Sequence, residues 1–412
     1  MSGPTAYRSS GRRVLDKFCP IPQRFEDVYG KVLFVTLLFF LTFISRFIFS
    51  PLMPSIGEDV GLSPGQAGSL FLLASIGVFG GSLFSGFVSA RLKHRGTLIL
   101  AALVTGATLM ICYFADSVWF VRTAMIVLGV CAGLNQPSVT ATVAAMVRRE
   151  DWGKALSVQQ LGPRLSYAVA PFLAVGLLAA FSWQASLAIL GVFAAAAGIA
   201  FLFWGDCGGF PGTPPNLRLF GGIIRLRSFW IMVLLFALGI GAQAGLYTMM
   251  PLYLTEEQGF TTASANTLLG LAMIPPLFTT FFAGWLTDRI GEKRSILLFM
   301  IATGLAIIAV GSTSSGWLVV SLFVLSALSG CFFPPALAAL SRIVQPNLRN
   351  LVAGLVSPSA FLIGGGLLPV ALGYMGEAYT FSLGIIITGI AVIAGAFLVF
   401  AVNLLDTLEA GC

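Results

Sequence analysis

Apolar residues run through this chain in long stretches that are separated by short polar segments. Twelve stretches are long enough to cross the hydrocarbon core of a membrane, which takes about 20 residues of helix. They cover residues 31–56, 64–90, 97–115, 118–147, 153–180, 184–205, 229–254, 262–288, 295–312, 316–343, 350–375 and 380–404. Membrane-spanning strands would instead alternate in segments of about 10 residues. The pattern therefore predicts an all-α membrane protein with twelve transmembrane helices.

Composition and charge support a membrane protein with a defined orientation. The chain is 57% hydrophobic and 9% charged, whereas a soluble domain has about 25% charged residues. Its net charge of +7 would suit nucleic-acid binding, but 20 of the 23 Lys and Arg residues fall in the N-terminal segment and alternate loops. Because basic loops stay inside, we expect both termini in the cytoplasm of a multi-pass inner-membrane protein. The opposite loops carry Glu58, Asp59, Asp116, Glu256, Glu257 and Glu377 and no basic residue.

The twelve stretches fall into two related halves. The longest polar connection in the middle, residues 206–228, is rich in Gly and Pro and leaves six stretches on each side. The halves repeat at an offset of 197–198 residues, which pairs Pro137 with Pro334 and Pro171 with Pro369. Such repeats are typical of secondary transporters, whose substrate site lies between the halves near the midplane. The expected parts are a cytoplasmic segment 1–30, bundles over 31–205 and 229–405, a cytoplasmic linker 206–228 and a tail 406–412.

A motif at the end of the eighth stretch points to a family. Residues 284–294, GWLTDRIGEKR, resemble the loop signature of the major facilitator superfamily. The resemblance covers about residues 31–405. It implies that superfamily's fold, in which twelve transmembrane helices form two pseudo-symmetric six-helix bundles.

The same resemblance implies a gate at the cytoplasmic side. In that family the acid of the motif caps a neighbouring helix and the basic residues brace the cytoplasmic gate, which makes Gly284, Asp288 and Arg289 gating candidates. The first-half copy of the motif keeps a basic residue at Arg91, a fourth candidate, but has Ala90 in place of the acid.

Three arginines lie inside apolar stretches: Arg46, Arg122 and Arg164. No Asp or Glu lies at comparable depth. An unpaired arginine at membrane depth costs about 2.5–3.5 kcal/mol on the insertion scale. We therefore expect these arginines to hold an anion.

Arg46 has the most informative surroundings. Thr42 and Ser50 lie four residues to either side, so the three polar residues share one helix face. The interval from Arg46 to Pro54 is similar to the first span of the organophosphate:phosphate antiporters and the sialin-like anion:cation symporters. In both branches the corresponding arginine contacts the substrate anion. The alternative is an arginine that snorkels to water or bonds backbone carbonyls.

Arg164 lies on a second polar face, with Gln160 at i−4 and Tyr167 at i+3. Its interval to Pro171 resembles the organophosphate antiporters, in which a basic substrate-contacting residue precedes a proline by seven positions. Arg122 lies close to the external face of its stretch, and both a structural and a functional interpretation of it stay open.

The seventh stretch adds Gln243 and Tyr247, one turn apart. At the repeat offset Gln243 is the counterpart of Arg46, and organophosphate antiporters have a second arginine there. The glutamine favours a smaller or less charged anion, such as a carboxylate. Asn135 in the fourth stretch supplies further hydrogen-bonding groups, while aromatic residues such as Phe361 mostly indicate packing, with one or two lining the cavity.

The chain lacks the acids that usually couple transport to protons. Where sialin-like symporters have acids, just before the first-span arginine and in the fourth span, this chain has Ser45 and Ala132. Since an arginine stays charged at physiological pH, it binds an anion but carries no proton. The proton then travels with the substrate, or one anion is exchanged for another, and the rim acids Glu256 and Glu257 are the alternative.

These observations predict a secondary active transporter that moves a small organic anion by alternating access. The expected partners are that anion, protons or a counter-anion, and the lipid bilayer, with no nucleic acid and the chain acting as a monomer. One alternative is a drug:proton efflux antiporter, which would need membrane-embedded acids and a glycine-rich fifth span. Another is a non-transporting receptor on the same fold. The sequence has no nucleophile–base pair, metal-ligand cluster or nucleotide loop, so we expect neither an enzyme nor a cofactor.

Overall fold

The computed structural model of the protein describes residues 22–213, 217–345 and 348–402. Most of the expected N-terminal segment and all of the expected tail 406–412 lie outside these ranges. Within them the chain is almost entirely helical, and its β-structure is an isolated bridge between Gln23 and Val147. Eleven helical stretches in the described part are long and apolar enough to cross a membrane.

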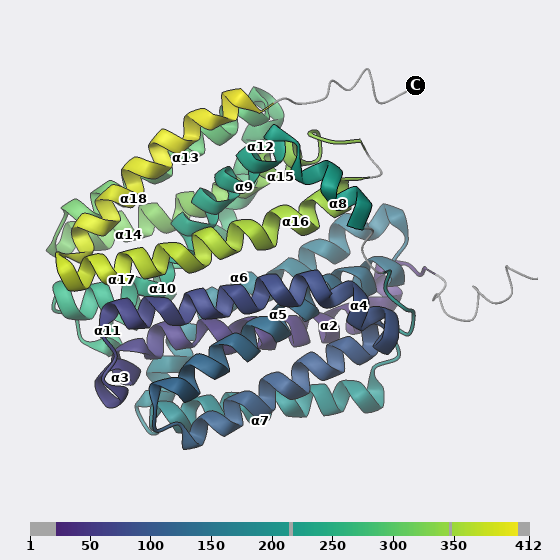
Figure 1. Ribbon diagram of the computed structural model, residues 1–412, viewed down its shortest axis with the longest axis horizontal. Helices are drawn as coiled ribbons and strands as arrows, with labels where there is room; N and C mark the ends of the chain where they lie inside the picture. Colours follow the sequence, from purple (N-terminus) through teal and green to yellow (C-terminus); the bar gives the residue numbers. More distant parts are fainter. Residues whose placement is uncertain (1–21, 214–216, 346–347, 403–412) are drawn as a thin grey trace, which may run out of the picture.

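One of these stretches contains two crossings, which accounts for the twelve that the sequence predicts. Helix α4 spans Pro64–Ile111, and 48 residues of straight helix would be about 72 Å long, more than twice the membrane core. Its backbone breaks at Lys93, where φ is 62°, and the chain turns back there (Figure 1).

The first half of the molecule holds spans 1 to 6. Span 1 consists of two helices in sequence, because Pro51 has no N–H to continue the hydrogen-bond ladder. The helices of this half are α2 Phe25–Phe47, α3 Phe49–Val60, α4 Pro64–Ile111, η1 Cys112–Phe114, α5 Val118–Met146, η2 Arg149–Asp151, α6 Trp152–Leu178 and α7 Trp183–Trp204.

The second half holds spans 7 to 12 and follows the short helix α8 Leu217–Ile224. Three of its segments, η3, η4 and η7, are π-helical, a geometry that is frequent at functional sites. The helices are α9 Arg227–Ile240, η3 Gly241–Gly245, α10 Leu246–Leu252, η4 Tyr253–Glu257, α11 Thr262–Ala272, α12 Pro276–Ile290, α13 Glu292–Ser312, α14 Ser315–Ser329, η5 Gly330–Phe332, α15 Phe333–Leu340, α16 Arg349–Phe361, η7 Leu362–Leu367, α17 Leu368–Ala378, α18 Phe381–Ala396 and η8 Phe397–Ala401.

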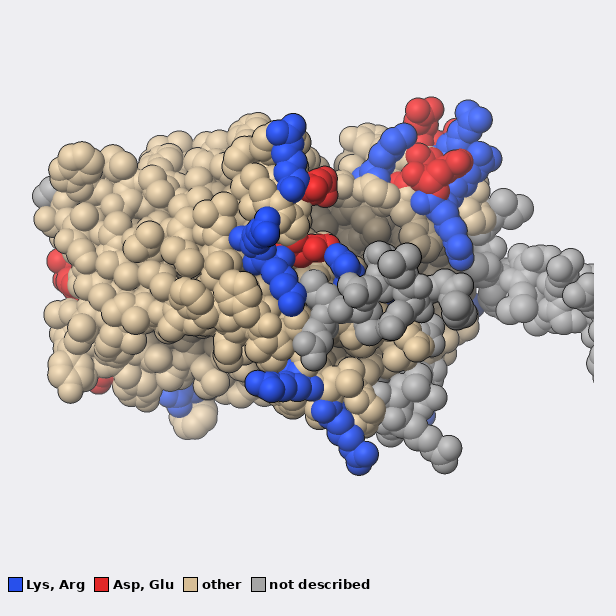
Figure 2. Space-filling view, turned by 90° about the horizontal axis from the view of Figure 1, so that it is seen from above, with Lys and Arg blue, Asp and Glu red and all other residues tan. Residues whose placement is uncertain are grey.

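The two ends of the molecule differ in charge (Figure 2). The end with the α4 turn and the loop between α12 and α13 carries most of the Lys and Arg side chains, and we call it the basic end. The opposite end, which we call the acidic end, carries acids such as Glu58, Glu256 and Glu377. Four helices begin at the acidic end with a Ser or Thr cap that accepts a backbone N–H, which satisfies part of the otherwise unpaired first turn. The caps are Ser63, Ser182, Thr261 and Thr380.

The halves contact each other closely at the acidic end. Helix α4 crosses α17 so tightly that a Cβ on Gly68 would lie 2.3 Å from the carbonyl oxygen of Pro369. At the same crossing the backbone N–H of Gly65 donates to the Glu377 carboxylate at 3.3 Å. Because glycines at this crossing have no side chain, the two helices can approach closely enough to close this end.

Buried hydrogen bonds between span 1 and the first two spans of the second half add to this closure. The Ser50 hydroxyl lies 3.2 Å from the carbonyl oxygen of Tyr247 and 3.1 Å from that of Thr248. The Asn266 amide donates to the Pro51 carbonyl at 2.9 Å. Unpaired buried carbonyls are costly, so these bonds favour the closed arrangement.

The basic end is arranged differently. Among the described residues, the ion pairs found at this end lie within one half, as between Lys154 and Asp151 in the first and between Arg342 and Glu292 in the second. The surface is hollowed between two groups of charged side chains at this end (Figure 2). The molecule is therefore closed at the acidic end and open at the basic end.

The segment that follows α7 is tied to the first half. The backbone N–H of Arg95 donates to the Gly208 carbonyl at 2.7 Å, and that of Gly212 donates to the Ser89 carbonyl at 3.0 Å. Gly208 has a φ of 75°, which favours glycine. Residues 205–213 therefore follow the α4 turn across the basic end.

Candidate substrate-binding site

Arg46 occupies the last turn of α2, where span 1 bends into α3. Its side chain is 3% exposed, and its Nε and Nη1 atoms have no hydrogen-bond partner. A buried guanidinium normally has partners for its N–H groups, because leaving them unpaired costs more than for a neutral group. The site is thus a positive charge that the described protein residues leave partly unsatisfied.

Three aromatic rings surround this guanidinium. Its central carbon lies 5.3 Å from the ring centre of Phe43, 4.7 Å from that of Phe47 and 4.6 Å from that of Phe361. A desolvated cation–π contact contributes about 2 kcal/mol or more, which offsets part of the burial cost. The ring faces do not accept hydrogen bonds from the in-plane N–H groups as an anion does. Arg46 is therefore held in place while its Nε and Nη1 remain without an acceptor.

A small cavity adjoins Arg46 at the junction of the two halves. Its volume is about 10 Å³, close to that of one water-sized sphere. The described residues that line it include no acid, and they come from both halves of the molecule. They are Arg46, Phe47, Phe71, Ala74, Ser75, Ala244, Thr248, Phe361 and Gly365.

Tyr167 and Tyr247, both predicted as site residues, lie in the same layer as Arg46. The ring centre of Phe47 is 4.2 Å from that of Tyr167, which in turn is 5.1 Å from that of Tyr247. The Tyr247 hydroxyl donates to the backbone carbonyl of Tyr167 at 2.9 Å. These contacts join α6 of the first half to α10 of the second, so the layer closes the path toward the acidic end.

Arg164 and Gln160 lie nearer the basic end on α6. Arg164 is half-buried one turn before Tyr167, and Gln160 is exposed one further turn away. The packing face of α6 is on another side, where the Ser166 hydroxyl donates to the Phe40 carbonyl at 3.2 Å. The two predicted residues are therefore on the part of α6 that faces away from α2, and neither lines the Arg46 cavity.

Two other predicted residues, Asn135 and Gln243, are not among the described residues that line the cavity. The Asn135 amide donates to the Thr42 hydroxyl inside the first half, and Asn135 is fully buried. Gln243 is half-buried in η3, with its amide nitrogen 3.9 Å from where a Cβ on Gly330 would lie. The residues that follow it on the same helix, Ala244 and Thr248, line the cavity instead.

Arg122, for which two interpretations were open, lies on the outer surface. Its guanidinium is 4.9 Å from the ring centre of Trp119, a side chain that is 71% exposed. This position suits an interfacial residue, because Trp and Arg are both favoured where a membrane meets water.

The predicted gating residues lie at the basic end, where the halves are apart. Asp288, Arg289 and Arg91 are exposed, and Gly284 has open space where a Cβ would be. The Arg289 guanidinium lies 4.1 Å over the ring of Trp285 on its own helix. In this conformation the gating candidates are thus positioned on the open side.

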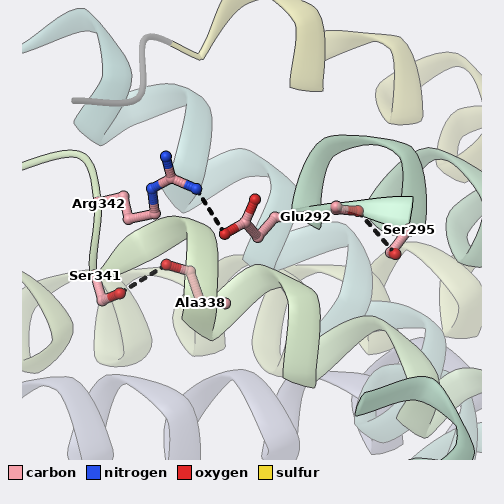
Figure 3. Close-up of polar contacts among 6 residues, drawn as sticks. Glu292, Ser295, Ala338, Ser341 and Arg342 are labelled. Carbon is pink, nitrogen blue, oxygen red and sulfur yellow. Dashed lines mark hydrogen bonds and ion pairs between the residues drawn. The ribbon is translucent and has the colours of Figure 1, made fainter. Parts of the chain in front are cut away.

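Sequence reasoning missed an ion pair made by a residue of this motif. Glu292 at the start of α13 accepts from Arg342 at 2.8 Å (Figure 3). Arg342 follows α15, so the pair braces two loops of the second half. The signal in the sequence was two opposite charges at the ends of spans 9 and 10, both on the basic side.

The sequence model of the Major Facilitator Superfamily matches residues 35–274 and again 231–408. The chain belongs to the major facilitator superfamily. It is 23% identical to the probable sulfoacetate transporter of Cupriavidus necator, over 90% of this chain and 93% of that protein. It is 24% identical to multidrug resistance protein 2 of Bacillus subtilis, over 83% and 88% of the two chains.

Solved structures confirm the superfamily's fold. One similar structure is the crystal structure of a bacterial homolog to the human lysosomal transporter Spinster, in its inward-facing and occupied conformation. The match covers 92% of this chain and 97% of the Spinster homolog. Its TM-score is 0.76 and its sequence identity 16%. The predicted multi-pass membrane protein with two six-helix bundles is therefore confirmed, as is its assignment to a family of transporters and not of enzymes.

Proposed function

We propose that the protein is a secondary active transporter that moves a small organic anion by alternating access. The observation that carries the proposal is the buried Arg46, whose unpartnered N–H groups adjoin a cavity shared by both halves. Burial of an unpaired arginine costs about 2.5–3.5 kcal/mol in a membrane. A substrate anion that pairs with it recovers that cost only while bound, which makes binding strong and selective for negative charge.

The chemistry of the lining favours an anion over a cation. Arg46, Ser75 and Thr248 are the polar members among the described lining residues, and none can carry a negative charge. The similarity to a sulfoacetate transporter supports the same class of substrate. The similarity to a multidrug resistance protein supports a drug transporter instead, but a cationic drug would meet a positive charge in this cavity.

The closed acidic end and open basic end support alternating access. By the positive-inside rule the basic end faces the cytoplasm, which makes this conformation inward-facing, with both termini cytoplasmic in an inner membrane. We propose that the bundles over 31–205 and 229–405 rock against each other within a monomer. When the basic end closes, Asp288 and Arg289 approach the first half near Arg91. Arg164, Gln160 and Gln243 then flank the path to Arg46.

We propose that the coupling proton travels with the substrate, or that a second anion is exchanged, because no acid is among the described residues that line the cavity. Uptake of a bound anion into proteoliposomes should then respond equally to a pH gradient in the native protein and in Glu256→Gln. A gradient dependence that disappears in Glu256→Gln would instead assign the proton to that acid.

A ligand panel tests the proposed function. Carboxylates, sulfonates and phosphates, together with cationic drugs, are added to the purified protein, and the shift of its thermal unfolding temperature is measured. We expect stabilisation by at least one class of anion and none by the cationic drugs, since a ligand stabilises only the state that binds it. Stabilisation by cationic drugs without any response to anions would show a drug transporter.

A further inference from the structure

We propose that the Arg46 cavity receives the head group of a monocarboxylate, and that Ser75 is the second residue that binds it. This inference rests on the proposed function and names the substrate class of the same site. It starts from a residue on α4 that the sequence did not single out.

Ser75 is a buried serine without a hydrogen-bond partner. It is 1% exposed, and its Oγ bonds to no described group. Serine hydroxyls in helices usually donate to the carbonyl four residues earlier, as Ser45 does to Leu41 and Ser166 does to Gly162. The Ser75 hydroxyl does not make this hydrogen bond, and Ser75 lines the Arg46 cavity.

The cavity therefore presents donors that lack an acceptor. Nε and Nη1 of Arg46 and the hydroxyl of Ser75 are unpaired, whereas the Thr248 hydroxyl already donates to the Gly245 carbonyl at 2.8 Å. A buried donor without a partner is destabilising, and hydrogen bonds to a charged group are the stronger kind. An oxygen with negative charge satisfies both residues at once, while a water leaves the charge of Arg46 unbalanced.

The size and charge of the cavity select the head group. A volume of about 10 Å³ holds one oxygen-sized atom, and its other walls include the rings of Phe47, Phe71 and Phe361. Ser75 has little freedom to retreat, since a Cβ on Gly366 would lie 2.9 Å from its Cβ. Any of these head groups can insert one oxygen, but a carboxylate then leaves one further oxygen outside the cavity, whereas a sulfonate or phosphonate leaves two that must fit against the apolar rings. One arginine also balances one negative charge, which favours a monoanion.

The test compares ligands that share a body and differ in head group. Isothermal titration calorimetry measures benzoate, benzenesulfonate and phenylphosphonate, and then butanoate, propanesulfonate and propylphosphonate. We expect the carboxylate of each series to bind tightest, with an advantage of about tenfold. Ser75→Ala should weaken carboxylate binding about tenfold, the loss typical of one hydrogen bond to a charged group.

Two further variants make the result specific. Ser45→Ala is the matched control, because Ser45 is buried beside Arg46 but its hydroxyl already donates to Leu41. We expect it to leave affinity unchanged. Ser75→Gly removes the hydroxyl and widens the cavity, so it should reduce the difference in affinity between carboxylate and sulfonate. It also replaces Ser75→Ala in the test if the Ser75→Ala protein does not fold.

Each contrary outcome has a distinct meaning. Equal affinities in Ser75→Ala and Ser45→Ala would remove Ser75 from the site, and tightest binding of a sulfonate or phosphonate would overturn the substrate class. Both results leave the proposed function standing so long as binding is lost in Arg46→Gln. If no anion shows binding that depends on Arg46, the proposed function fails as well.

Discussion

Replacing Arg46 with glutamine should stabilise the anion-free protein and abolish its response to anions. The substitution removes a buried charge whose Nε and Nη1 are unpaired, so we expect a gain in stability of at most about 2.5–3.5 kcal/mol, the insertion cost of an arginine. Truncating one partner of a buried charge pair costs about 2–5 kcal/mol in binding, which is a loss of at least about 30-fold in affinity. Thermal unfolding with and without a stabilising carboxylate measures both effects.

Arg122→Gln is the matched control for this prediction. Arg122 also lies in an apolar span, but it packs over the exposed Trp119 on the outer surface. Its replacement should change neither the unfolding temperature nor the anion response by much. A protein with Arg46→Gln that still responds to anions as the native protein does would show that Arg46 is a structural residue.

Replacing Gly68 with valine should prevent the acidic end from closing. A Cβ at this position would lie 2.3 Å from the Pro369 carbonyl oxygen, and backbone atoms cannot yield as a flexible side chain does. The α4–α17 crossing would have to separate, which favours the conformation that is open at the acidic end. We expect loss of transport, together with faster backbone hydrogen exchange around residues 64–72.

Gly80→Val separates this effect from a general effect of valine in α4. Gly80 is on the same helix, and no heavy atom lies within 4 Å of the position that a Cβ there would take. The substitution should therefore preserve transport and the exchange pattern. If Gly68→Val shows hydrogen exchange and transport at the native rates, the closed acidic end is unnecessary for the transport cycle.

The spans and the two halves could be predicted from the sequence because both depend on the order of residues within short segments of the chain. Twenty apolar residues in a row force a helix in lipid, since each backbone group must be bonded within the segment. The turn at Lys93 joins two such helices so closely that they form one continuous helical stretch, yet the charges around it still mark a loop.

The candidate site could be predicted only where burial has a high cost. Arg46 was conspicuous because a charge in an apolar span requires an explanation. Ser75 and Phe361 were not, because serine and phenylalanine are ordinary in membrane helices and the cavity brings together segments from both halves. Gln243 and Asn135 share helices with cavity or packing residues, and polarity alone could not tell which face each occupies.

The gate shows a different limit of sequence reasoning. The motif around Asp288 and Arg289 marks a loop whose contacts change with conformation, and in the present one both side chains are exposed. The pairing of Glu292 with Arg342 depends on how spans 8 to 10 pack, which no local pattern specifies.

The central claim is that this protein transports an anion bound at Arg46. Counterflow tests it most directly: proteoliposomes are loaded with the unlabelled carboxylate that stabilises the protein best, and entry of the radiolabelled compound is measured for the native protein, Arg46→Gln and Arg122→Gln. We predict transient accumulation of label with the native protein and Arg122→Gln and none with Arg46→Gln. Accumulation with Arg46→Gln at the native rate, or its absence from the native protein despite binding, would contradict the claim.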